Sequence, residues 1–203
     1  MASDMSISVE KSAPEDRHLN GPFDESEVTG IRPYVDLGAI RVEPREGLNL
    51  RLEVEEGTQR IVAVNLDQFG STLQVQPFAA TTSSGLWHEI RQQVMDHVTS
   101  QGGTAEPVMG PVGVELRCRI PVMTASGQAG MQDARFLGVD GPRWFVRGVI
   151  TGPAVSEAST GRAMVDLFRS LVIVRGVSPM PPREMLPIKV PEQAGGLSSQ
   201  GSL

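Results

Sequence analysis

Apolar and polar residues alternate along much of the chain between residues 48 and 151. A period of two places every second side chain on the same face, which is typical of half-buried β-strands. The first predicted strands are joined by short turns containing glycine, which indicates an antiparallel meander. The alternation predicts strands at residues 48–55, 61–66, 72–78, 112–122, 131–139 and 143–151.

The last of these strands, residues 143–151, carries large apolar side chains on both of its faces. Trp144 begins one alternating apolar row and Phe145 begins the other. Because a strand with two apolar faces is covered on both sides, we expect it near the centre of the sheet. Asp140-Gly141 directly precedes it, and this dipeptide tolerates the positive φ angles of a tight turn. The strand and its predecessor are therefore predicted to form a hairpin.

Two segments have a helical period instead. Between about residues 83 and 101, apolar residues recur at intervals of three to four, and Ser83 or Ser84 is available to cap the first turn. A second helix is predicted at about residues 162–170. Residues 171–174 (LVIV) form either its last turn or a short buried strand, and their β-branched side chains favour the strand.

These elements predict an α+β fold, with an antiparallel sheet of about six to eight strands and two main helices packed as an α/β sandwich. A single domain is expected over residues 33–176. Residues 1–32 are polar and mostly acidic, which predicts a flexible N-terminal arm. Residues 177–192 are rich in proline and apolar side chains, which predicts an extended strap. The Gly/Ser-rich residues 193–203 are predicted to be a disordered tail.

Five segments stand out along the chain: GPFDESEV, YVDLGAIRV, GLWHEIR, RFLGVDGPRWFVRGVITG and PMPPREMLPIKVP. In combination they resemble an uncharacterised actinobacterial family, domain of unknown function 3710, over roughly residues 21–192. The most specific part of the resemblance is GVDGPRWF, and the family implies no activity and no catalytic residue. The order of elements also resembles the Mog1/PsbP/LpqN type of α/β sandwich, whose members bind partners or lipid-like ligands.

Charge and composition exclude several classes of protein. The formal net charge of −6 and the pI near 5.1 argue against nucleic-acid binding, which needs a basic surface. No apolar run approaches the ~20 residues that span a bilayer, so no membrane span is expected. The N-terminus lacks a secretory signal, and the one cysteine allows no intrachain disulfide. We therefore expect a cytoplasmic protein.

Residues that commonly carry chemistry are few in this chain. Cys118 falls on an apolar strand face and is predicted to be a buried structural thiol. His88 and His97 project from opposite sides of the predicted helix, so they cannot share a metal ion. Trp87 and Trp144 could line a ligand cleft, but the periodicity assigns both to the core. No metal, phosphate-loop or nucleophile motif is present, so no catalytic residue, metal or cofactor is predicted.

Arginines are the most informative polar residues. If Arg117, Arg119 and Arg147 share one face of the sheet, they form a cationic patch for a carboxylate, a phosphate or the acidic arm. The alternative is that strand arginines pair with Glu115, Asp133 and other neighbours on a solvated face, and we favour this alternative.

The sequence therefore favours a non-catalytic, cytoplasmic binding or adaptor protein that engages a protein partner through its sheet edge, its strap or its acidic arm. One alternative is a carrier of a small or lipid-like molecule with an apolar cavity between sheet and helices. Another is an enzyme that holds an anionic substrate with the arginine patch, which would also need a converging Asp or Glu.

Overall fold

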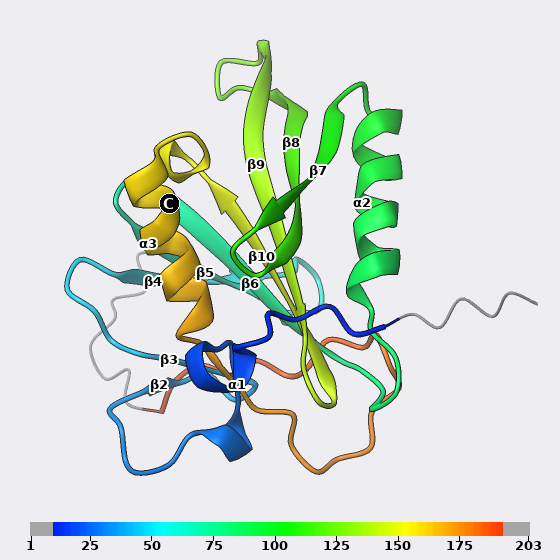
Figure 1. The fold of residues 1–203 in the computed structure, drawn as a ribbon. Coiled ribbons are helices and arrows are strands. Elements are labelled where there is room, and N and C mark those ends of the chain that lie inside the picture. Colours follow the sequence, from blue (N-terminus) through cyan, green and yellow to red (C-terminus); the bar gives the residue numbers. More distant parts are fainter. Residues whose placement is uncertain (1–9, 193–203) are drawn as a thin grey trace, which may run out of the picture.

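The computed structural model describes residues 10–192 and has a seven-stranded antiparallel sheet as its main element (Figure 1). Its strand order is β4-β5-β6-β10-β9-β8-β7, so the doubly apolar strand β10 lies at the centre, between β6 and β9. The predicted α+β class is confirmed. The strands are β4 (Asn49–Val54), β5 (Ile61–Gln68), β6 (Ser71–Ala79), β7 (Thr104–Gly110), β8 (Gly113–Met123), β9 (Ala129–Asp140) and β10 (Trp144–Thr151).

A second, smaller sheet has the order β1-β11-β3-β2. Its strand β11 pairs in parallel with β1 and antiparallel with β3, so segments far apart in sequence meet here. Because residues 172 and 173 form β11, the strand alternative for the LVIV segment is confirmed. The strands of this sheet are β1 (Phe23–Asp24), β2 (Val35–Asp36), β3 (Ile40–Val42) and β11 (Val172–Ile173).

The two longest helices pack on opposite faces of the large sheet. Helix α3 (Ala158–Arg169) lies over Gly148, where an added Cβ would come within 2.8 Å of the Phe168 ring. Helix α2 (Trp87–Ser100) lies over Gly138, where an added Cβ would come within 2.2 Å of Trp87. Both strand glycines thus allow an aromatic ring to approach the backbone. We call these two sides of the sheet the α3 face and the α2 face.

Residues 10–32 differ from the predicted flexible arm. They contain α1 (Arg17–Asn20), β1 and the short 3₁₀ helix η1 (Glu25–Glu27), and they pack against the domain. The composition misled the prediction because contacts with residues far along the chain, which composition cannot show, hold the segment. Arg169 donates to Asp16 at 2.6 Å, and Trp144 donates through Nε1 to Asp24 at 2.8 Å. Residues 1–9 lie outside the described part of the chain.

The proline-rich C-terminal segment runs between the two sheets. The backbone N–H of Leu186 donates to the carbonyl of Pro77 in β6, and that of Lys189 donates to the carbonyl of Leu37 beside β3. Leu186 is buried against the main core. The predicted tail at residues 193–203 lies outside the described residues. Within residues 10–192, no helix has the length and apolar character needed to cross a bilayer.

Candidate functional site

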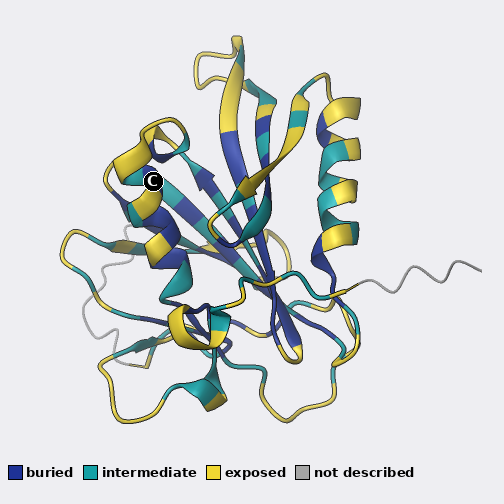
Figure 2. Ribbon diagram, in the orientation of Figure 1, coloured by how far each residue is buried: buried dark blue, intermediate teal, exposed yellow. Residues whose placement is uncertain are grey.

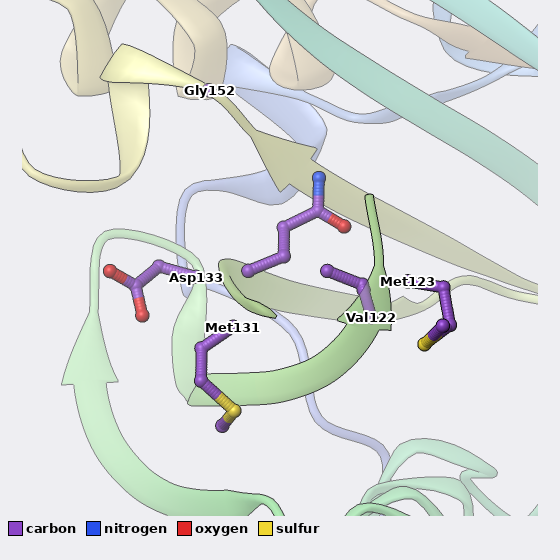
Figure 3. Close-up of a pocket in the computed structure, with 6 residues that line it drawn as sticks. Val122, Met123, Met131, Asp133 and Gly152 are labelled. Atoms are coloured by element: carbon purple, nitrogen blue, oxygen red, sulfur yellow. The ribbon is translucent and has the colours of Figure 1, made fainter. Parts of the chain in front are cut away.

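The β8–β9 hairpin extends beyond both long helices (Figure 1), and residues at its free end are exposed (Figure 2). Met123 of β8 and Met131 of β9 are 70% and 48% exposed. A surface hollow of about 600 Å³ lies beside them, next to the end of β10 (Figure 3). We call this region the hairpin surface. The hollow is lined by Val122, Met123, Met131, Gln132, Asp133 and Gly152.

Two of the three predicted arginines flank the hairpin surface. Arg119 pairs in register with Asp133, and its Nε lies 3.2 Å from that carboxylate. Arg117 lies two residues earlier on the same α3 face, where its Nη1 donates to the carbonyl of Val155 at 2.9 Å. Arg147 does not join them. Arg117 of β8 pairs in register with Arg135 of β9, which pairs with Ile150 of β10, so these three side chains share one face. Arg147 is three residues before Ile150 on β10, so its side chain points to the opposite face. The three arginines therefore do not form one patch.

A buried ion cluster lies behind the hairpin surface. Glu115 is fully buried, and its two carboxylate oxygens accept from Arg135 at 3.0 and 2.9 Å. One of these oxygens also accepts from Nε of Arg117 at 2.7 Å. Because the 3₁₀ helix η2 (Pro153–Val155) accepts from Arg117, the cluster fixes the segment that leads into α3. The alternation indicated that the Glu115 side chain points away from the apolar face of β8. Nothing in the sequence indicated that η2 covers the opposite face.

Arg147 occupies the opposite, α2 face of the central strand. It lies between Gln76 of β6 and Gly138 of β9. Its Nη2 donates to Oε1 of Gln76, while its Nε–H is buried without an acceptor among the described residues. Burial lowers the pKa of the Arg147 guanidinium. Because no carboxylate compensates this desolvation within residues 10–192, Arg147 is the least satisfied of the predicted site residues.

Comparison with known families assigns the chain directly. Residues 21–196 match a family described as a protein of unknown function, DUF3710. The chain belongs to the DUF3710 family. The resemblance predicted from the sequence motifs is thereby confirmed. Comparison with curated proteins gives no match.

In this DUF3710 protein, two of the motif segments that carry the resemblance bind each other. The GPFDESEV segment supplies Asp24, which accepts from Nε1 of Trp144 in the GVDGPRWF segment at 2.8 Å. Arg17 lies over the Trp144 ring at 5.6 Å from its centroid and donates to Glu27 through both terminal nitrogens, at 2.8 and 2.5 Å. Since Trp144 is fully buried and its indole N–H is satisfied, it serves the packing of the domain.

The turn aspartate of GVDGPRWF has a role that sequence reasoning missed. Asp140 is buried, and its carboxylate accepts from the backbone N–H groups of Leu86, Ser12 and Trp87 at 2.7, 2.9 and 3.4 Å. It thus caps helix α2, for which the sequence had suggested Ser83 or Ser84. Burial raises the pKa of Asp140, although these hydrogen bonds and the charge of Lys11 oppose the change.

The remaining candidates for chemistry lie apart from each other. Cys118 is buried beneath α2, and burial raises the pKa of its thiol to about 11, which disfavours a nucleophilic thiolate. Trp87 is fully buried and donates from Nε1 to the carbonyl of Val114 at 2.7 Å. Within residues 10–192, no three His, Cys, Asp or Glu side chains are grouped so that they could hold a metal ion.

Proposed function

We propose that this DUF3710 protein is a non-catalytic, cytoplasmic binding protein that docks a protein partner on the hairpin surface. The observation that carries the proposal is the exposure of Met123 and Met131 beside a hollow, on a hairpin that extends past both helices. Methionine side chains are flexible and polarisable, so they adapt to the shape of an apolar partner surface. Arg119 and Asp133 supply charged groups at the rim, which favour register and specificity.

The arm and the strap are weaker candidates for partner binding than they were from sequence alone. Both segments use some of their groups inside the domain, as the hydrogen bond of Asp24 with Trp144 and the burial of Leu186 illustrate, although Ile31 and Val177 stay exposed. A partner would have to displace these contacts before it could bind there. The hairpin surface needs no such rearrangement, because its methionines are already exposed.

The two alternatives have less support from the structure. A carrier needs an enclosed apolar cavity, whereas the space between the sheet and α3 is filled by fully buried side chains such as Met164, Phe168 and Leu73. An enzyme acting on an anionic substrate needs a carboxylate that converges on free arginines. On the α3 face, the buried carboxylate of Glu115 is already engaged by Arg117 and Arg135.

Affinity capture from the lysate of the source cells tests the proposal. Wild-type protein is compared with Met123→Ser/Met131→Ser and with a matched control, Val177→Ser, which changes an exposed apolar side chain outside the hairpin surface. We expect a protein retained by wild type and control to be lost by the double variant. Repeating the measurement with the purified candidate should give an affinity weaker by roughly tenfold or more, as for a central apolar contact.

Circular dichroism of each variant provides the folding control. Since both methionines are exposed, their replacement should leave the spectrum and the thermal midpoint close to those of wild type. Recovery of the same partners by the wild type and both variants, or of none by any of the three, would remove the support for the hairpin surface.

A further inference from the structure

Arg147 and Arg135 lie on adjacent strands of the sheet but on opposite faces, and their surroundings differ sharply. Arg135 is buried on the α3 face, where Glu115 accepts from it at two points. Arg147 lies on the α2 face, where Gln76 is its hydrogen-bond acceptor and no carboxylate among the described residues pairs with it. A desolvated cation without a counter-charge is costly, so such a group is expected to attract an anion.

The carboxylate seen on this part of the α2 face is held away from Arg147. Glu53 of β4 accepts from Gln74 at 2.7 Å and from Asn65 at 3.4 Å. The amide of Gln76 donates to the carbonyl of Val62 at 2.9 Å, which fixes the side chain that accepts from Arg147. Glu53 is therefore engaged by amides on the strands between it and Arg147, and Gln76 is the side chain in register with Arg147 on β6.

We propose that Arg147 and Gln76 form a binding site for the carboxylate of an organic acid on the α2 face of the sheet. Arg147 is only partly buried, so its side chain is not fully sealed from solvent. The guanidinium has five N–H donors, so the ligand carboxylate accepts from donors that Gln76 does not engage, while Gln76 holds the side chain in place through Nη2. A carboxylate fits better than a phosphate because it carries the single negative charge that one guanidinium neutralises.

This site is independent of the proposed partner docking, since Met123, Met131 and Asp133 of the hairpin surface lie on the other face of the sheet. Arg117, Arg119 and the two methionines take no part in it. Loss of partner capture in the hairpin variants would leave carboxylate binding at Arg147 unchanged, and the reverse holds as well. The two proposals can therefore fail separately.

The test is an NMR titration of the full chain with sodium acetate at constant ionic strength, followed through the side-chain Nε–H signal of Arg147. We expect a saturable shift that is absent in Arg147→Met and retained in the control Arg51→Met, which removes an arginine already paired with Asp67 on the same face. The backbone spectra of both variants report whether they fold. A parallel titration with inorganic phosphate should give a smaller shift.

Either of two results overturns the proposal. The first is that the Arg147 signal does not shift at any acetate concentration below the one at which the other arginine signals begin to shift. The second is that phosphate binds more tightly than acetate, which would assign the site to a different class of anion.

Discussion

Replacing Asp140 with asparagine tests how one buried carboxylate joins three parts of this protein. Its oxygens accept from the N–H of Leu86 at 2.7 Å and from the N–H of Ser12 at 2.9 Å, with a longer contact to Trp87 at 3.4 Å. An amide of the same size keeps one acceptor oxygen, so its NH2 group would face a backbone donor. A buried donor left without an acceptor costs about 1–3 kcal/mol, and bonds to charged groups are worth about 1.5–3 kcal/mol. We therefore expect Asp140→Asn to lose about 2–4 kcal/mol of stability at neutral pH.

Urea denaturation measures this loss, with Asp133→Asn as the matched control. Asp133 is exposed on the same strand β9, so its replacement should change the free energy of unfolding by less than about 0.5 kcal/mol. Hydrogen exchange gives the site-specific readout, because the amides of Ser12 and Leu86 should lose protection before those of the central strand β10. An Asp140→Asn variant as stable as the control would refute the role of Asp140 as the link between the N-terminal segment and helix α2.

The pH dependence of the Asp140→Asn effect has a defined sign. Burial raises the pKa of Asp140 above its ordinary value of 3.8. The folded state then holds the proton more tightly than the unfolded chain does, so the resulting stability is fully present below pH 3.8 and is lost as pH rises through the folded pKa. Asparagine does not titrate, so the difference in unfolding free energy between wild type and variant should shrink with rising pH in that window. A difference that grows with pH would contradict the raised pKa.

Two further predictions concern the two faces of strand β8. Glu115→Gln leaves Arg135 buried without its charged partner, so urea denaturation should show a loss of about 3–5 kcal/mol in the free energy of unfolding. The control Arg119→Gln breaks an exposed pair and should lower this free energy by less than about 0.5 kcal/mol. Equal effects of the two variants would show that η2 does not seal the cluster. Because burial raises the pKa of Cys118 to about 11, its thiol should resist a disulfide reagent at pH 8 in the folded protein and react at once in urea; rapid reaction of the folded protein would be inconsistent with the burial.

The local pattern of side chains determined most of the secondary structure. The alternation in residues 143–151 placed β10 at the centre of the sheet, because a strand with two apolar faces must be covered on both sides. The β-branched residues 172 and 173 likewise indicated a strand rather than a helical turn. These features depend on neighbours within a few residues, so the chain alone contains the information.

Tertiary structure decided everything that depends on a distant partner. The cap of helix α2 comes from Asp140, 54 residues after the Leu86 N–H that it accepts from, and composition could not show that the acidic N-terminal segment docks beside it. Alternation placed Glu115 opposite the apolar row of β8 and Arg147 in the same row as Phe145, but it could not show which of these positions would be sealed. Glu115 accepts from Arg117 and Arg135 beneath η2, whereas Arg147 donates to the neutral side-chain amide of Gln76. Which charged groups are neutralised is a property of the packed sheet, because the free energy of a buried charge is set by what the fold brings next to it.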